Sequence, residues 1–398
     1  MHSLILAWAS YILALLLPAQ RAEVSLYNET FVVEYQSLLF ANGPLGLDEA
    51  GIGSHYAAVT EKDWLPLHDQ LQHQRSRLGL NDWLYVKLVR QTVDAVAGFA
   101  AENERRVLEF HLLTLAGFDA RLCYDAHDVY VYAHTADALF EVPMITHGER
   151  RYVNLTAALS PRSRTARSLS LHPLRPLPYG VSLSFDLSEL PGFAPDVQAR
   201  TFRFRYGGEL HTVHGLSDRT IAAWMNDYPF FEEGRYVETP MSPTTSGRLL
   251  AELRPMLEGK SERESLALLA AFTRSAFEYK EDKQSFGYSK PMIADEVLYY
   301  PVSDCEDRSA LYFTLVRELL DLPVIAIAYD DHLSVAVASE ELASEELGGE
   351  HALYHEGRRY FVCDPTGPKE SVSIGAPPAG YADRPYDIVA AYAPTVRT

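Results

Sequence analysis

The segment SDCEDRS at residues 303–309 places one cysteine among three carboxylates and an arginine, directly before an apolar pattern of helical spacing. The apolar residues recur from Ala310 to Leu320, and Pro323 marks the end of this predicted helix. A helix N-terminus presents free backbone N–H groups and the positive end of the helix dipole, and both favour a thiolate. The segment therefore predicts a helix that carries Cys305, a candidate nucleophile, at its N-terminus.

Two strand-like runs follow this helix, and His332 opens the second of them. A third run, Tyr360–Cys363, ends at Asp364. A histidine within reach of a thiol can take its proton, and an aspartate can orient that histidine. The order of cysteine, helix, strand, histidine, strand and aspartate therefore predicts a catalytic triad of Cys305, His332 and Asp364.

This order resembles the transglutaminase-like branch of the papain-type cysteine enzymes. The resemblance is carried by DCEDRS at 304–309, DH at 331–332 and CDP at 363–365. It implies that Cys305 is the nucleophile, His332 the general base and Asp364 the acid that orients the base. It covers about the last third of the chain, and it implies a papain-like domain in which a helix is followed by an antiparallel sheet.

Each member of the triad also has an ordinary structural explanation. A lone cysteine is most often a small buried hydrophobe, although the polar neighbours of Cys305 argue against a core position. His332 could be an inert turn residue after Asp330-Asp331, and Asp364 precedes a proline in a pattern that commonly ends a strand. Cys363 is expected to point into the core, because adjacent side chains of a strand point to opposite faces.

The surroundings of the thiol raise two further questions. Nearby carboxylates raise the pKa of a thiol and oppose the helix dipole, so His332 as imidazolium would have to outweigh them. Alternatively, Arg308 or the chain fold could pair those acids or hold them away from the thiol. An oxyanion hole needs donors directed at the developing charge. The backbone N–H of Cys305 is one candidate donor, Gln284 or Tyr288 is the second, and Asp304 is a further supporting candidate.

The acidic residues of this region also suggest an oxygen-rich metal site. Its members would be Asp304, Glu306, Asp307, Asp330, Asp331 and His332. Carboxylates favour Ca²⁺ or Mg²⁺, but the sequence has no EF-hand or His-Glu-x-x-His spacing, and it has no phosphate loop or dinucleotide fingerprint. We therefore predict neither a metal nor a cofactor.

Length and composition limit the classes of function. A chain of 398 residues is expected to form two or three domains, and its 47% apolar content can build real cores. A formal net charge of −19 argues against a nucleic-acid partner, because phosphate binding needs clustered lysine and arginine. The three cysteines, Cys123, Cys305 and Cys363, leave at least one thiol free.

The N-terminus carries an almost wholly apolar stretch, Leu4–Leu17, which has the length of a signal-peptide core. Ala19 and Ala22 are small residues that suit cleavage, and an uncleaved membrane anchor is the alternative. The expected location is therefore periplasmic or secreted. The wider chain also resembles bacterial exported proteins with a C-terminal transglutaminase-like domain, on the basis of Leu80–Trp83 and Ser303–Ser309.

Patterning along the chain predicts an α+β protein in four parts. Residues 1–22 form the signal or anchor, and 23–160 form a mixed N-terminal domain. Residues 161–245 form a Pro-rich linker and a β-rich module, and 246–398 form the transglutaminase-like catalytic domain.

Local signals refine this division. Within 180–240, Gly207-Gly208 predicts a hairpin turn, and a helix is expected near Ile221–Asn226. In the N-terminal domain, Gly51–Gly53 predicts a turn and Thr60 predicts the N-cap of a polar helix.

Residues 100–154 resemble a degenerate second copy of the C-terminal core. Both segments have a polar start, an apolar helix and then a tyrosine closely followed by a histidine, which is His127 in the first copy. The alignment sets Ala101 opposite Cys305, so this copy is predicted to lack thiol chemistry. The alternative is that any helix–strand–strand unit aligns this well.

The main hypothesis is an exported cysteine hydrolase, a peptidase or amidase that cleaves a peptide or other amide substrate, with the cell envelope as one source. Cys305 would attack the carbonyl and form a thioester, which water then hydrolyses. Transfer of the acyl group to an amine is the transamidase alternative. The second hypothesis, of another class, is a non-catalytic cell-envelope binding protein.

Overall fold

The structure is a computed structural model that describes residues 19–36, 45–159, 169–177, 179–344, 352–366 and 374–394. The apolar segment Leu4–Leu17, on which the expected export depends, lies outside the described residues. Over the described residues, no helix is long and apolar enough to cross a membrane. The fold is of the α+β class, as the patterning predicts.

The chain forms two compact units, which we call the first and the second unit. The first unit comprises Met1–Phe185 and Pro191–Ala194, and the second comprises Asp186–Leu190 and Pro195–Thr398. The expected separate module at 161–245 does not exist as such, because its strands are divided between the cores of the two units.

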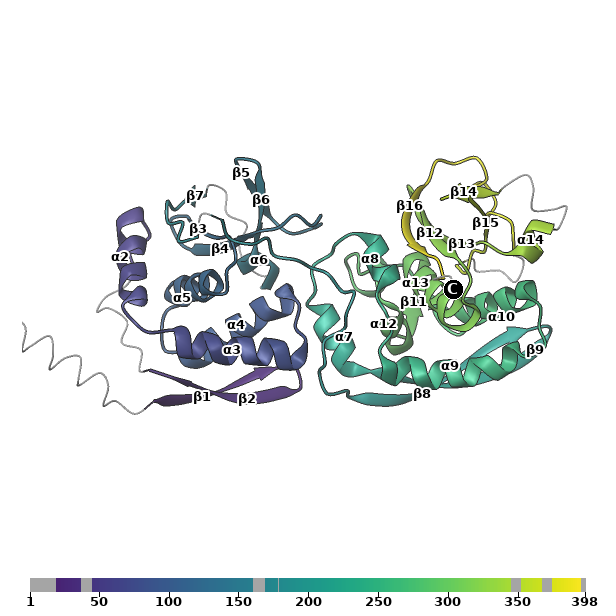
Figure 1. The fold of residues 1–398 in the computed structure, drawn as a ribbon, viewed down its shortest axis with the longest axis horizontal. Helices are drawn as coiled ribbons and strands as arrows, with labels where there is room; N and C mark the ends of the chain where they lie inside the picture. Colours follow the sequence, from purple (N-terminus) through teal and green to yellow (C-terminus); the bar gives the residue numbers. More distant parts are fainter. Residues whose placement is uncertain are drawn as a thin grey trace, which may run out of the picture. The chain divides into compact units, whose positions relative to one another are not determined.

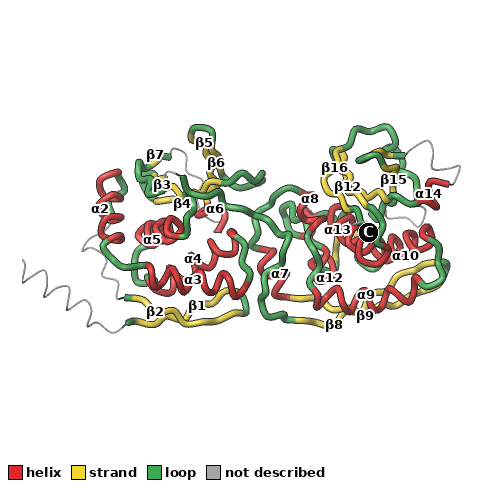
Figure 2. Tube along the Cα trace, viewed as in Figure 1, coloured by secondary structure: helices red, strands yellow, loops and turns green. Residues whose placement is uncertain are grey.

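The first unit begins with a hairpin, continues with helices and ends with a sheet (Figures 1 and 2). Its elements are β1 (Gln20–Leu26), β2 (Glu29–Tyr35), α2 (Glu49–Thr60), α3 (Leu65–Leu78), α4 (Asp82–Val96), α5 (Glu102–Leu115), β3 (Ala120–Tyr124), β4 (Val129–His134), β5 (Met144–His147), β6 (Arg150–Asn154), α6 (Leu155–Leu159) and β7 (Ser170–Leu171).

The second unit also begins with a hairpin and ends with a sheet, with more helices between them. Its elements are β8 (Val197–Tyr206), β9 (Glu209–Asp218), α7 (Arg219–Asn226), α8 (Glu233–Glu238), α9 (Pro243–Leu257), α10 (Glu262–Ser275), β10 (Glu278–Tyr279), α11 (Asp282–Ser285), α12 (Ala294–Tyr299), β11 (Val302–Ser303), α13 (Cys305–Leu320), β12 (Val324–Tyr329), β13 (His332–Val337), α14 (Glu340–Ser344), β14 (Leu353–His355), β15 (Arg358–Val362) and β16 (Asp387–Tyr392).

The two units share one topology. The five-stranded sheet of the first has the order β5-β6-β4-β3-β7, and that of the second has the order β14-β15-β13-β12-β16. In both sheets the fourth strand of this order comes before the third along the chain, and the third comes before the second. All pairings within the two sheets are antiparallel. The sheets therefore correspond strand for strand.

The helical layers correspond as well. In the first unit α3 packs on β2, α4 on β1 and on α5, and α5 on β3 and β4; in the second unit α9 packs on β9, α10 on β8 and on α13, and α13 on β12 and β13. In Figure 1 each unit accordingly shows a hairpin, a layer of helices and a sheet, in that order. The helix of Cys305, α13, is the counterpart of α5.

The hairpin of β8 and β9 belongs to the core of the second unit. It turns at Gly207-Gly208, as predicted, and both glycines have positive φ angles of 60° and 83°. Phe202 and Phe204 alternate onto the inner face and place their rings 5.9 and 5.5 Å from that of Phe272 on α10. The hairpin is therefore part of the core of the second unit and not of a separate module.

Substitution of Phe272 tests this assignment. Phe272 is fully buried, and its replacement by alanine removes the ring against which the hairpin packs. Phe272→Ala is expected to lower the free energy of unfolding by about 3–5 kcal/mol, measured by urea denaturation. Leu210→Ala, on an exposed residue of the same hairpin, serves as the control with a change within about 0.5 kcal/mol. A change below about 1 kcal/mol in Phe272→Ala would contradict the assignment.

Candidate active site

The start of α13 is fixed by carboxylates rather than exposed to solvent. Cys305 is the first helical residue and Asp304 is the N-cap. Asp307 accepts the backbone N–H of Asp304 at 3.1 Å with one oxygen and that of Met292 at 2.9 Å with the other. Asp307 is fully buried, so it orients the helix start and is not available to substrate.

Arg308 ties together the three segments that surround the thiol. Its guanidinium donates to the carbonyl of Phe277 at 2.9 Å, to Oγ of Ser303 at 3.1 Å and to the carbonyl of Thr366 at 3.0 Å. The side chain is fully buried, and its guanidinium also lies 5.0 Å from the centre of the Tyr279 ring. The sequence pattern did not single out Arg308 for this role.

His332 and Asp364 lie side by side. His332 Nε2 is 3.5 Å from Asp364 Oδ2, and their side chains are 12% and 2% exposed. Thr366, which the sequence reasoning missed, lies 3.4 Å from the same nitrogen and donates its hydroxyl to Asp364 at 2.8 Å. The backbone N–H of Thr366 also donates to Oδ1 of Asp364. This bond closes a local turn of the kind that aspartate side chains commonly form with the backbone two residues on.

These contacts keep Asp364 ionised. Burial raises the pKa of its carboxyl, but hydrogen bonds from His332 and Thr366 outweigh burial and hold the pKa below its ordinary value. Because Nε2 is the imidazole nitrogen that faces Asp364, Nδ1 is the nitrogen that is left to act on a substrate or a thiol.

Two tyrosines enclose the imidazole. The ring of Tyr329 is nearly parallel to that of His332, with centres 6.4 Å apart, and the ring of Tyr381 lies 5.0 Å away. The Tyr381 hydroxyl and the Arg384 guanidinium both donate to Asp331, at 3.1 and 2.8 Å. The C-terminal segment therefore packs over the histidine, and this contact limits the positions that the imidazole can take.

Cys305 begins α13, the helix that packs on β13, and its thiol is directed at Glu306. Its S–H donates to Glu306 Oε2, 2.9 Å away, and in the described chain no hydrogen bond joins the sulfur to the imidazole. The backbone N–H of Leu333, the residue after His332, lies close enough to the sulfur to lower the pKa of the thiol. The structure thus brings the cysteine to the start of β13 without an established thiol–imidazole contact.

The thiol is protonated in this arrangement. Burial raises the pKa of Cys305 well above its ordinary value, and the carboxylates of Glu306 and Asp304 raise it further. The nearby backbone N–H of Leu333 lowers the pKa but is outweighed. The sequence predicts that the helix dipole lowers the pKa of the thiol and that the nearby carboxylates raise it. The raising effects are the larger, so the thiol is neutral.

The predicted oxyanion donors have other contacts. Gln284 is exposed on α11 and its amide lies 3.5 Å from Glu281, whereas the Tyr288 hydroxyl lies 3.4 Å from Asn226. Neither contact involves a member of the predicted triad. The backbone N–H of Cys305 sits in the first turn of α13, where an N–H group has no intrahelical acceptor, so it remains a candidate donor.

Asp304 is part of a compact carboxylate cluster. One oxygen each from Asp282, Asp304 and Glu306 lie within 4.8 Å of one another. Asp304 is 5% exposed; Oδ2 accepts the N–H of Asp282 at 3.2 Å, and Oδ1 has no hydrogen-bond partner among the described residues. Three carboxylate oxygens suit Ca²⁺ or Mg²⁺ rather than a transition metal. Protonation of one carboxyl group relieves the same repulsion between the negative charges.

The other two cysteines have no such setting. Cys123 and Cys363 are buried at 1% and 0% exposure, all three thiols are free, and the Cys363 thiol donates to the carbonyl of Phe361 at 3.4 Å. The prediction that Cys363 belongs to the core is confirmed. Cys305 is the more accessible thiol of the three.

The same place in the first unit has a different chemistry. Both helix starts use a residue at the third helical position as a capping acid, Glu104 in α5 and Asp307 in α13. This register sets Glu102 opposite Cys305, so the predicted match of Ala101 is off by one residue. Val129 pairs with Tyr124 as His332 pairs with Tyr329, which leaves His127 in the loop.

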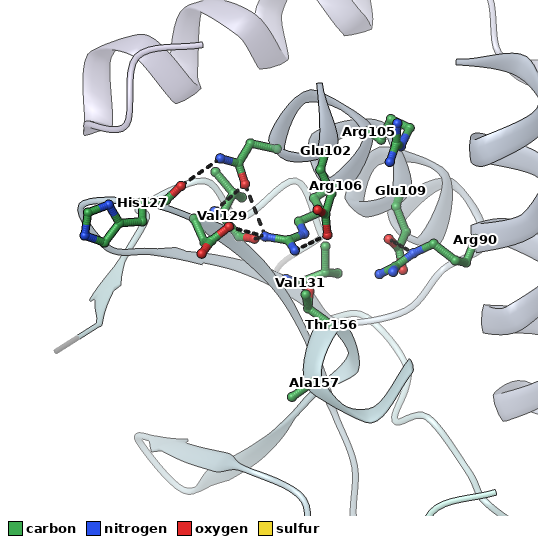
Figure 3. A network of polar contacts seen from close by, with 12 residues as sticks. Arg90, Glu102, Arg105, Arg106, Glu109, His127, Val129, Val131, Thr156 and Ala157 are labelled. Atoms are coloured by element: carbon green, nitrogen blue, oxygen red, sulfur yellow. Dashed lines mark hydrogen bonds and ion pairs between the residues drawn. The ribbon is translucent and has the colours of Figure 1, made fainter. Parts of the chain in front are cut away.

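An arginine network fills this position. Arg106 donates to the carbonyl of Val129 at 2.8 Å and lies 3.1 Å from Asp128, and it also pairs with Glu102 (Figure 3). Asn103 accepts a further bond from the same guanidinium at 3.2 Å. Since a glutamate stands where Cys305 stands and a valine where His332 stands, the first unit has no thiol at this position.

No protein-family model, curated protein or solved structure matches this chain.

The carboxylate cluster predicts a particular dependence of stability on pH. Burial and Glu306 raise the pKa of Asp304 to about 8. The folded protein then binds more protons than the unfolded chain between about pH 4 and pH 8, so this group destabilises the fold increasingly as the pH rises through that range. Asp304→Asn is expected to raise the free energy of unfolding by about 1 kcal/mol or more at pH 8, and by much less at pH 5.

Urea unfolding at the two pH values measures this difference. Asp383→Asn removes an exposed carboxylate of the same unit and is expected to leave stability unchanged at both. An Asp304→Asn variant that is less stable than wild type at pH 8 would show that the ionised carboxylate is needed and would contradict the prediction.

Proposed function

We propose that the second unit is a transglutaminase-like cysteine hydrolase that cleaves an amide bond, as a peptidase or amidase. Cys305 is the nucleophile, His332 the general base and Asp364 the residue that orients the imidazole. The observation that carries the proposal is the geometry at the start of β13: Asp364 Oδ2 lies 3.5 Å from Nε2 of His332, and the backbone N–H of the next residue, Leu333, is near enough to the Cys305 sulfur to lower the pKa of its thiol.

The chemistry follows from the protonation states. The resting thiol is neutral, so Nδ1 of His332 takes its proton as the sulfur attacks the carbonyl carbon. Asp364, which is ionised, stabilises the imidazolium that forms. The imidazolium then protonates the leaving amine, and water hydrolyses the thioester; an amine in place of water would give transamidation.

Rotation of the cysteine side chain precedes this step, because the S–H is directed at Glu306 in the resting structure. A cysteine side chain has three staggered rotamers, and rotation about its first side-chain bond redirects the sulfur without moving the helix. Binding of the substrate carbonyl beside the free N–H groups of α13 would favour the attacking rotamer.

A non-catalytic binding protein is the second candidate. The Cys305 thiol donates a hydrogen bond to Glu306, and the pKa of the thiol is raised. Both features oppose nucleophilic attack and therefore favour this alternative. The export of the protein, and with it a cell-envelope substrate, stays a prediction from the N-terminal sequence.

A thiol-directed acyl probe distinguishes the two candidates. Wild-type protein is expected to be labelled at Cys305, as located by mass mapping, and Cys305→Ala is expected to lose the label. The buried Cys123 and Cys363 act as internal controls in the same molecule, because neither should react while the protein is folded. Equal labelling of wild type and Cys305→Ala, or no labelling of either, would favour the binding protein.

A further inference from the structure

A half-open pocket, which we call the cavity, lies beside the hairpin and the helices of the second unit. Its volume is about 870 Å³, within the usual range of sites for small ligands. It is lined by the end of β8 and the following turn, by one face of α10, and by residues next to the start of α13. Phe204, Ala270 and Phe277 supply apolar wall.

The charges of this lining are all positive. Arg203, Arg205, Arg274 and Arg308 contribute to it, and no aspartate or glutamate is found among its described residues. Lys260 adds a further cation nearby, with its Nζ 5.7 Å from the ring of Tyr206, another residue of the lining. This composition differs from that of the chain as a whole, whose net charge is −19.

The four arginines have different roles. Arg308 uses its donors on the protein backbone and Ser303, and Arg274 donates to the backbone carbonyl of Asp364 at 3.1 Å. Arg203 and Arg205 are exposed on β8 and form no ion pair with any described residue. Their side chains alternate with the buried Phe202 and Phe204, so the two guanidinium groups lie on the exposed face of the strand and are open to an anionic ligand at the cavity. Arg274 and Arg308 add to the positive potential of the walls.

The cavity adjoins the proposed catalytic centre. Tyr279 is part of its lining and is paired with Ser303, two residues before Cys305. The thiol and the Tyr279 hydroxyl lie close enough for Cys305 to contribute to the raised pKa of that tyrosine. Arg274 reaches the Asp364 segment from the other side of the lining. Cys305, His332 and Asp364 are not themselves among the described lining residues, so Tyr279 and Arg274 are the links between the cavity and the segments of the proposed catalytic centre.

We propose that this cavity is the substrate-binding site and that it selects amides with a carboxylate on an apolar body. The inference rests on the proposed hydrolase function. The guanidinium groups of Arg203 and Arg205 bind the carboxylate, in the geometry that arginine and carboxylate groups favour. The apolar walls cover the rest of the ligand, and Tyr279 marks the end at which the scissile amide meets Cys305. Acidic peptides are the substrate class that this chemistry fits.

Binding is measured without catalysis, in the Cys305→Ala protein, so that failure of the hydrolase proposal does not affect the result. The probe is N-dansyl-Glu-Phe, which combines two carboxylates with apolar groups, and the readout is fluorescence anisotropy. Saturable binding is expected, and it should weaken as salt rises from 0.05 to about 0.5 M, because salt screens exposed charges. The neutral diamide of the same peptide is expected to bind much more weakly.

Arg203→Gln/Arg205→Gln is the test variant. It is expected to weaken binding of the dansyl peptide about tenfold, which is the effect of losing two partly exposed ion pairs. Arg248→Gln, an exposed arginine on α9 outside the cavity, is the matched control and should bind as the parent does. Equal affinity of the double variant and the parent, equal affinity for the diamide, or no saturable binding of the peptide would each overturn the proposal.

Discussion

The hydrogen bonds of the Arg308 guanidinium hold together the part of the second unit in which the proposed chemistry takes place. A charged group without water is costly unless its donors are satisfied, and here the three partners come from three different segments. Burial lowers the pKa of Arg308 to about 10, so the group is still charged at neutral pH. The folded state must therefore bring Phe277, Ser303 and Thr366 to one point.

The consequence of this constraint is the arrangement around the thiol. Cys305 comes two residues after Ser303, and Asp364 comes two residues before Thr366, so the segments of the proposed nucleophile and of the proposed orienting acid are held by the same cation. The corresponding arginine of the first unit, Arg105, instead lies 3.1 Å from Asp94 and donates to the carbonyl of Ala100. The two units thus share a topology, but the arginines in the first turns of α5 and α13 bind different partners.

Much of the second unit could be predicted because its signals are local. The turn at Gly207-Gly208 and the helix near Ile221–Asn226 both form as their sequence patterns indicate. The placing of His332 beside Asp364 could also be predicted, since the order of strands along the chain brings their ends together.

The failures have physical reasons. Gly51 was expected in a turn but lies in α2, where a side chain would clash with the backbone of Gly46; the glycine is there for close approach and not for a turn. Thr60 ends α2, and the next helix begins at Leu65 without a side-chain cap. The role of Arg308 and the fate of the 161–245 module depend on contacts between distant segments, which single-sequence patterns do not contain.

The central claim is that His332, and not the nearer Glu306, takes the proton of Cys305. The direct measurement is the rate of acylation of Cys305 by 4-nitrophenyl acetate at pH 7, followed by intact mass and peptide mapping in wild type, His332→Ala and Glu306→Gln. The account predicts a loss of about 100-fold or more in His332→Ala. It predicts an equal or faster rate in Glu306→Gln, because removal of a negative charge lowers the pKa of the thiol. An unchanged rate in His332→Ala together with a loss in Glu306→Gln would contradict it.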